Sequence, residues 1–177
     1  MSNSLKKTAK ERIELAFIKL IQEKDINEIS VTSLVKLAKV NRSTFYVNYT
    51  DIYDLANKIK KNMYFNVLSL YKEERNSNIH SYDFLKLFEH IKDNQMYYKT
   101  MFKLNFNFLD YCSNYLSIDD AIRYLGTSDN LEYHLEFFKA GMKAIIKKWL
   151  DNDCQESPLE MANIIKLEYE RKNIFIK

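Results

Sequence analysis

Residues 38–49 read AKVNRSTFYVNY and lie between two segments whose apolar residues recur at helical spacing. The stretch contains neither glycine nor proline, yet it separates two predicted helices. Phe45 and Tyr49 are four residues apart, so they share one face of a helix. The predicted helix at 42–48 therefore has an apolar face for packing. Its other face is polar and aromatic, which no core requires.

Composition narrows the fold class. Hydrophobic residues make up 46% of the 177 residues, which is enough to bury a core. Two glycines and one proline are far fewer than the turns of a sheet-rich fold require. The sequence therefore predicts an all-α protein with one large domain or two small ones.

The predicted helices follow from apolar residues at helical spacing and from capping residues. Near the N-terminus we expect helices at about 8–24, 32–38, 42–48 and 51–74. Ser30 or Thr32, Asn41 and Asp51 are the expected N-caps of the last three. A polar linker is expected at 74–81, followed by helical segments at 82–93, 95–104, 106–124 and 131–151. Ser157, with Pro158 and Glu160, predicts the start of a last helix.

Three short helices and a long one, with a tight connection between the second and the third, follow the plan of a helix-turn-helix domain. Charge agrees with this plan, because residues 1–62 carry a net charge of +5 and residues 63–177 one of −2. Arg42 can donate two hydrogen bonds to a guanine, and Tyr46 can contact a phosphate. The expected DNA-binding residues are Thr32, Lys39, Asn41, Arg42, Ser43, Thr44, Tyr46 and Asn48.

Residues 29–55, ISVTSLVKLAKVNRSTFYVNYTDIYDL, resemble the N-terminal domain of the TetR family of transcriptional regulators. The shared positions are Ser30, Val31, Ala38, Val40, Thr44, Phe45, Tyr46, Tyr49, Asp54 and Leu55. This combination is far more specific than a general helix-turn-helix pattern. The resemblance implies a DNA-binding head, a linking helix and a helical regulatory body.

Three positions depart from the family pattern. Lys39 stands where the family has a turn glycine, and a lysine with positive φ costs on the order of 1 kcal/mol. Asn48 replaces a histidine and can still donate to a phosphate. Ile52 replaces a lysine and cannot donate to a phosphate. Loss of that phosphate contact would lower the salt slope of DNA binding by about one unit. We hypothesise that Lys39 supplies the missing charge.

Residues 137–165 are similar to the last two helices of a subgroup of these regulators. In that family the two helices form a four-helix bundle with those of the partner subunit. Gly141 and Ala144 would allow close approach of the helices. The expected interface residues are Gly141, Met142, Ile145, Ile146, Trp149, Ile164 and Ile165. The same residues could instead form the core of one subunit, and the two roles are compatible on different faces.

Regulators of this family usually hold an effector among the C-terminal helices. The candidate lining residues are Tyr97, Tyr98, Met101, Phe102, Phe108, Tyr111, Phe137 and Phe138. These side chains would surround a flat or apolar compound. An aromatic stripe at helical spacing is more often an ordinary core than a ligand pocket, and a protein effector is an alternative to a small molecule.

Other functions lack a sequence pattern. His80, His90 and His134 have no second ligand at a metal-binding spacing, and no catalytic triad, nucleotide loop or HExxH motif occurs. Cys112 and Cys154 form no CxxC pair, so we expect reduced, packed thiols. No apolar run approaches the roughly 18 residues of a membrane span, and the N-terminus does not resemble a secretory signal. We expect no metal, cofactor, enzymatic activity or membrane partner, and a cytoplasmic location.

The sequence thus predicts an all-α regulator with a DNA-binding domain at 1–50 and a linking helix plus regulatory and dimerisation domain at 51–177. The expected function is repression: a homodimer binds a palindromic double-stranded operator and is released by an effector. Two alternatives stay open. One is an activator that responds to a protein partner, and the other is a helical ligand-binding protein that has lost DNA binding.

Overall fold

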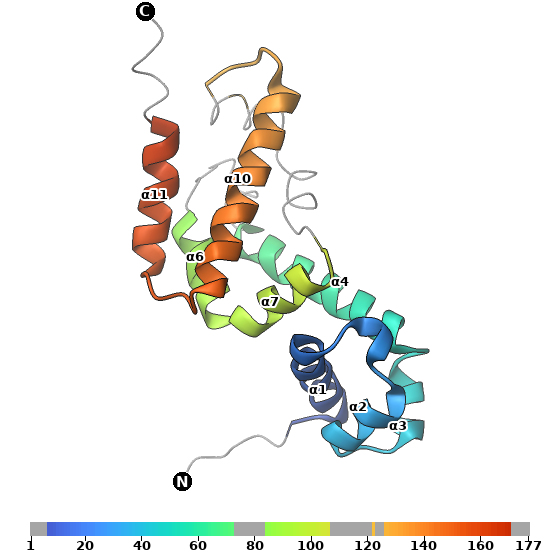
Figure 1. The fold of residues 1–177 in the computed structure, drawn as a ribbon. Coiled ribbons are helices and arrows are strands. Elements are labelled where there is room, and N and C mark those ends of the chain that lie inside the picture. Colours follow the sequence, from blue (N-terminus) through green and yellow to red (C-terminus); the bar gives the residue numbers. More distant parts are fainter. Residues whose placement is uncertain (1–6, 73–83, 107–121, 123–125, 171–177) are drawn as a thin grey trace, which may run out of the picture.

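The computed structural model describes residues 7–72, 84–106, 122 and 126–170 (Figure 1). These residues form eight α-helices and one 3₁₀ turn, with no strand among them, which confirms the all-α prediction. The head contains α1 (Ala9–Glu23), a 3₁₀ turn η1 (Ile26–Glu28), α2 (Val31–Ala38) and α3 (Arg42–Asn48). Helix α4 (Ile52–Leu70) leads away from it. The body contains α6 (Phe84–Asp93), α7 (Gln95–Lys103), α10 (Leu131–Asp151) and α11 (Pro158–Glu170).

Figure 1 shows the head at one end of the molecule and helices α10 and α11 at the other. Helix α4 runs between them, with α6 and α7 beside it. Helix α1 packs against α2 and α3 and also against α7, so α1 belongs to the head and touches the body. The head is therefore joined to the body by the α1–α7 contact as well as by α4.

Capping side chains mark where four of the eight described α-helices begin. Thr8 and Glu11 form a reciprocal capping box at α1, and Ser30 accepts from the Ser33 backbone N–H at α2. Asp51 accepts from the Asp54 N–H at α4. These contacts satisfy backbone donors that have no partner inside the helix.

At α11, Ser157 and Glu160 make the predicted capping box, with the Glu160 carboxylate accepting from the Ser157 N–H at 2.7 Å. The prediction for Asn41 was wrong in one respect. Asn41 is the residue before α3, but its side chain makes no capping hydrogen bond. Helix α4 ends at Leu70, about one turn before the predicted position. The predicted linker at 74–81 and most of the predicted segment at 106–124 lie outside the described residues.

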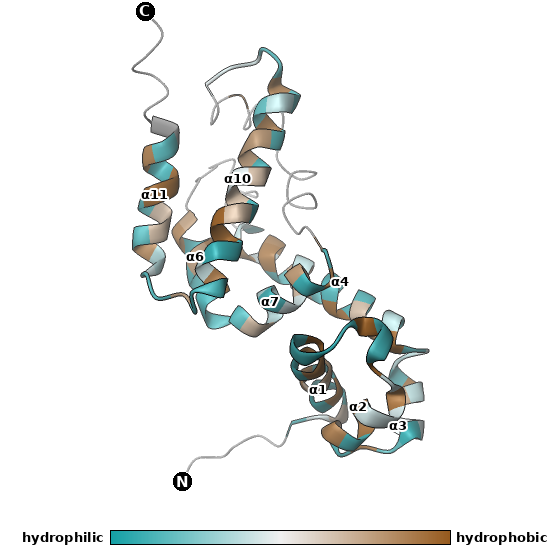
Figure 2. Ribbon diagram, in the orientation of Figure 1, coloured by the Kyte–Doolittle hydropathy of each residue, from teal (hydrophilic) through white to brown (hydrophobic). Residues whose placement is uncertain are grey.

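One continuous core runs from the head into the body. Apolar and hydrophilic residues alternate along α1, α4 and α10, as the colours in Figure 2 show. In the head, Phe17, Leu34 and Phe45 are completely buried. In the body, Phe88 meets the indole of Trp149 edge to face, with the ring centroids 5.4 Å apart. Because the core is continuous, the head packs directly against the body and is not connected to it by α4 alone.

Candidate nucleic-acid interface

One face of helix α3 packs in the core of the head. The side chains of Phe45 and Tyr49 are buried, and their ring centroids lie 5.6 Å apart. Both belong to the core that α1 and α2 complete. This matches the sequence prediction that these two residues hold the helix, and it leaves the opposite face free of the core.

The free face of α3 consists of Arg42, Ser43, Tyr46 and Val47, which are all exposed. The Tyr46 side chain is 51% exposed, and its ring meets Phe45 edge to face. Because Phe45 is buried, this contact fixes the direction of the Tyr46 ring. The exposed face of α3 therefore presents a guanidinium, a hydroxyl and a phenol to a binding partner, while the opposite face packs in the core.

Thr44 and Asn48 flank this face and are half-buried. The Asn48 side-chain amide donates to the Thr44 backbone carbonyl at 2.8 Å. An amide has two N–H donors, so one remains for an outside acceptor. Thr32, Lys39 and Asn41 are exposed at the start of α2 and in the turn before α3. All eight predicted residues thus lie in α2, in α3 or in the turn between them.

Val47 was missed by the sequence reasoning. Its side chain is 84% exposed, although valine is apolar and lies in the middle of α3. The available signal was that Val47 falls outside the apolar periodicity set by Phe45 and Tyr49. An exposed valine on this face contributes nothing to the core and is suited to apolar contact with a partner.

The turn between α2 and α3 is built around Lys39. Lys39 adopts the left-handed conformation, with φ 53° and ψ 51°, which is the geometry predicted for the position that usually holds glycine. The Val40 N–H donates to the Val35 carbonyl at 3.1 Å, as in the motif that commonly ends helices at a left-handed residue. A lysine there is strained, because its Cβ approaches the following carbonyl.

Arg12 supports this turn from α1. Its guanidinium Nη1 donates to the Lys39 carbonyl at 3.0 Å. The cation also lies at the C-terminal end of α2, where the helix dipole is negative. Arg12 is one of the cations that give residues 1–62 their net positive charge, and this contact shows that it also holds the turn.

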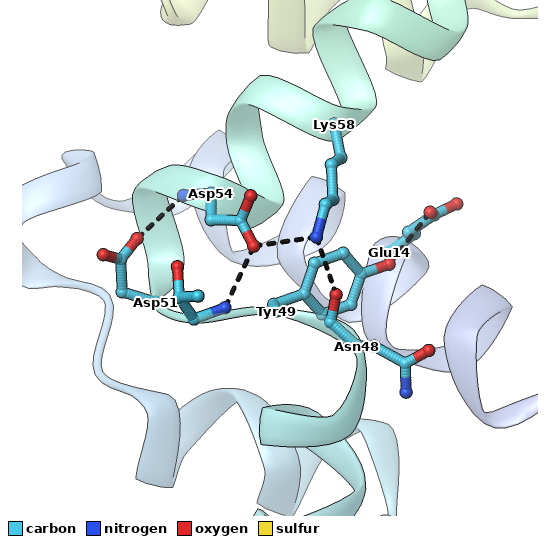
Figure 3. Close-up of polar contacts among 7 residues, drawn as sticks. Glu14, Asn48, Tyr49, Asp51, Asp54 and Lys58 are labelled. Carbon is cyan, nitrogen blue, oxygen red and sulfur yellow. Dashed lines mark hydrogen bonds and ion pairs between the residues drawn. The ribbon is translucent and has the colours of Figure 1, made fainter.

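The junction between α3 and α4 is a network of polar contacts (Figure 3). The Lys58 ammonium donates to the Asn48 carbonyl and to the Asp54 carboxylate, both at 2.9 Å. The Thr50 N–H donates to the same carboxylate. These hydrogen bonds lower the pKa of Asp54, with Lys58 the largest cause. Lys58 therefore ties the end of α3 to the first turns of α4.

Ile52, the residue in place of the family's lysine, is buried in the core. It cannot offer a charge to a phosphate, as expected. The neighbouring Tyr53 is exposed, and its hydroxyl donates to the Asn27 side chain at 2.6 Å. The start of α4 is thus held by apolar packing on one side and by a tyrosine contact with the 3₁₀ turn on the other.

Tyr49 connects α3 to α1. Its hydroxyl donates to the Glu14 carboxylate at 3.0 Å (Figure 3). Burial raises the pKa of the Tyr49 hydroxyl, and the negative charge of Glu14 raises it further. The phenol therefore stays protonated and keeps its role as a donor.

The predicted effector-binding residues do not share one environment. Tyr98 and Met101 are buried in the core, while Tyr97, Phe102 and Phe138 are half-buried. Phe137 is 68% exposed. Phe108 and Tyr111 lie outside the described residues. Tyr97 lines a cleft together with Glu14 and residues of α4, and the other described members of the set are not among the lining residues of that cleft.

The predicted interface residues fall into two groups, one buried within the subunit and one accessible at its surface. Four of them are buried within the subunit, and these are Met142, Ile146, Trp149 and Ile165. The Trp149 indole N–H donates to the Glu156 carbonyl at 3.2 Å, and its ring packs on Phe88. These four residues belong to the core of one subunit, which was the alternative that the sequence left open. Gly141, Ile145 and Ile164 remain accessible at the surface.

The described residues contain neither a metal-binding cluster nor a membrane-spanning helix. No group of three histidine, cysteine or acidic side chains there could hold a metal ion. None of the described helices combines the length and the apolar character needed to span a membrane. Cys154 is a free, buried thiol, and burial raises its pKa.

Comparison with known proteins identifies the family. Residues 77–167, just over half of the chain, match the TetR C-terminal family described as "Transcriptional regulator C-terminal region". The chain belongs to the TetR family of transcriptional regulators. The match lies entirely outside the head, so it is independent of the helix-turn-helix residues that carried the resemblance in the sequence. The TetR family is a family of DNA-binding regulators rather than enzymes.

The fold of the TetR family extends over most of the chain. The solved structure titled "Dihydroxyacetone kinase operon activator DhaS" is similar with a TM-score of 0.53. The two chains are 19% identical, and the alignment covers 92% of this chain and 96% of that one. Among curated protein sequences, none matches this chain. The structural likeness supports the TetR fold, and the family match supports the regulatory role.

Proposed function

We propose that this chain binds a palindromic operator as a homodimer and represses transcription until an effector releases it. One observation supports DNA binding above all others. Helix α3 presents Arg42, Ser43, Tyr46 and Val47 on a face that the core does not use, while Phe45 and Tyr49 seat the helix. A major groove accepts one helix, and such a face matches its chemistry.

The exposed side chains divide into two groups by chemistry. Arg42 suits bidentate donation to guanine, and Val47 suits contact with the methyl group of thymine. Tyr46, the free donor of Asn48 and the Lys39 ammonium suit phosphate oxygens, which position the helix without reading sequence. In this assignment Lys39 supplies the charge that the buried Ile52 cannot.

The division into a head at 1–50 and a body at 51–177 is part of the proposal. The α1–α7 contact supports a direct route between the two parts. In this contact the Gln22 amide donates to the Thr100 hydroxyl at 2.9 Å. An effector that favours one arrangement of the body would shift α1 and α4 together and change the spacing of the two heads. Such release requires different effector affinities for the two arrangements.

Dimerisation through α10 and α11 is supported by the residues that remain outside the subunit core. Gly141 lies on α10 with no heavy atom within 4 Å of a Cβ built there, so the surface at this point is open. Ile164 and Leu167 are exposed on α11. A second α10–α11 pair would cover these apolar side chains and complete a four-helix bundle.

Activation is the second candidate function. The similar solved structure is titled an operon activator, and at 19% identity it bears on fold alone. An activator would use the same face of α3 but would recruit transcription with a partner protein. A reporter gene under the chain's own promoter separates the two cases, because deletion of a repressor raises expression and deletion of an activator lowers it.

Gel-shift titration against DNA flanking the chain's own gene tests operator binding. We expect Arg42→Ala to change the preference among operator variants, because it removes a contact with a base. Tyr46→Phe is expected to weaken all sites alike. Equal losses on matched and mismatched operators for both variants would show that the assignment to bases and phosphates is wrong. Absence of any shift at low salt would favour a protein that has lost DNA binding.

A further inference from the structure

A polar cleft lies where the head meets the body. Its volume is about 360 Å³, and it is lined by Glu14, Ile59, Asn62, Met63, Phe65, Asn66, Asn94 and Tyr97. These residues come from α1, from α4, from the turn before α7 and from α7 itself. The cleft is therefore distinct from both the α3 face and the predicted aromatic set, of which Tyr97 alone takes part.

The volume of the cleft is at the lower end of the range of roughly 300–1,000 Å³ for small-molecule sites. Three asparagine amides supply donors and acceptors side by side. Asn94 donates to the His90 carbonyl at 2.9 Å, which leaves its own carbonyl oxygen for a ligand. Such a lining favours a small, polar compound over a large apolar one.

The charge of the cleft is negative. Of its eight described lining residues, Glu14 is the one acidic residue, and it is half-buried. One carboxylate oxygen accepts from Tyr49, which leaves further acceptor capacity on the group. The pKa of Tyr97 is raised by burial and then by the carboxylates of Glu14 and Glu11, so both groups act on this site.

Among the described residues, no lysine forms an ion pair with Glu14. Lys58 is bound by Asp54 and by the Asn48 carbonyl. Lys61 lies over the ring of Phe65, 5.9 Å from its centroid, and Lys103 donates to the Gln22 carbonyl. The Lys61 ammonium therefore already occupies the Phe65 ring, which leaves Glu14 and Tyr97 as the side of the cleft open to an added cation.

We propose that this cleft binds a small organic cation with one or more amino groups. The ammonium lies against the Glu14 carboxylate and the Tyr97 ring, and the amides of Asn62, Asn66 and Asn94 bind the remaining polar atoms. Because the cleft is formed by α1, α4 and α7, an occupant contacts the head and the body at once. Binding there holds the two parts in one arrangement, a property separate from operator recognition.

Titration with 1,4-diaminobutane, monitored by NMR chemical shifts and calorimetry without DNA, tests this site. Butane-1,4-diol serves as the neutral probe of the same length. We expect saturable shifts around the cleft with the diamine and none with the diol. Equal binding of both compounds, or no binding of the diamine, would overturn the proposal. Since no DNA is present, failure of operator binding leaves this result unaffected.

Charge variants on α4 give opposite expected outcomes. Asn66 is exposed in the cleft, so its replacement is tolerated by the core. Asn66→Asp is expected to tighten diamine binding and Asn66→Lys to weaken it, each by about tenfold for a change of about 1.4 kcal/mol. Asn57 is an exposed asparagine on the same helix outside the cleft lining. Asn57→Asp and Asn57→Lys are the matched controls, and equal effects at both positions would contradict a local site.

Glu14→Gln tests the carboxylate itself. The glutamine carbonyl can still accept from Tyr49, so the link between α1 and α3 is retained. Diamine affinity is expected to fall at least about tenfold, since the charge of the site is lost. Retained affinity in this variant, with an unchanged NMR spectrum elsewhere, would show that Glu14 is not the anchor.

Discussion

The head and the body use apolar residues differently. In the head, α3 is seven residues long and buries one narrow face, so Arg42, Ser43, Tyr46 and Val47 remain exposed. In the body, α10 is 21 residues long and carries apolar residues around much of its circumference. Met142, Ile146 and Trp149 face the subunit's own core, while Tyr133 and Phe137 are exposed.

This difference explains where sequence patterns are informative. When a short helix can bury only one face, the spacing of its apolar residues is enough to predict which side chains point inward. For a long helix with apolar residues on several faces, the spacing does not show which residues pack in the core of the subunit and which contact a partner subunit. Assignment of residues to an interface therefore needs the packing of α10 on its neighbours, which the spacing of residues does not contain.

The largest expected effect contrasts two neighbours on α3. Phe45→Ala removes a fully buried ring and is expected to lower the free energy of unfolding by about 3–5 kcal/mol. Val47→Ala removes an exposed side chain and is expected to change it by less than about 0.5 kcal/mol. Urea unfolding measures both. Val47→Ala is also expected to weaken operator binding in gel shifts, and similar stabilities of the two variants would contradict the orientation of α3.

The next pair tests the body. Ile165 is 1% exposed and Ile164 is 41% exposed, although the sequence assigned both to the interface. Ile165→Ala is expected to destabilise the subunit by about 2–5 kcal/mol, whereas Ile164→Ala costs less than about 1 kcal/mol. Sedimentation is expected to show a weakened dimer for Ile164→Ala. A dimer unaffected by Ile164→Ala would place the interface elsewhere.

Much of the head was predictable because its signals are local. The capping residues, the apolar spacing of Phe45 and Tyr49, and the left-handed turn at Lys39 all follow from residues within a few positions of one another. What could not be predicted depends on residues distant in sequence. Arg12 reaches the Lys39 carbonyl across 27 positions, and Glu14 meets Tyr49 across 35. No periodicity indicates such pairs.

Lys39→Gly separates stability from DNA binding within the head. Relief of the left-handed strain is expected to raise the free energy of unfolding by up to about 1 kcal/mol. Loss of the ammonium is expected to weaken operator binding and to reduce its salt slope by about one unit. Lys39→Asn is the control, because asparagine tolerates this conformation and also lacks the charge. An unchanged salt slope in both variants would show that Lys39 does not contact a phosphate.

The smallest expected effect is a dependence of the free energy of unfolding on pH, caused by His90 in the body. The three histidines of the chain are His80, His90 and His134, so the head contains none. His90 shares a hydrogen bond of 2.8 Å with the hydroxyl of Tyr98, which is completely buried. Burial lowers the pKa of His90, and the charge of Asp93 partly opposes this. The neutral imidazole is therefore favoured in the folded chain.

The sign of the effect follows from this shift. Because the unfolded chain binds the proton more tightly, stability is lost as the pH falls below the ordinary histidine pKa of about 6.5. Urea unfolding at pH 7 and pH 5.5 is expected to show this loss, and His90→Gln is expected to reduce it. His134→Gln on α10 is the control variant. If the loss persists in His90→Gln, other titratable groups of the chain cause it, and the His90–Tyr98 contact is not its source.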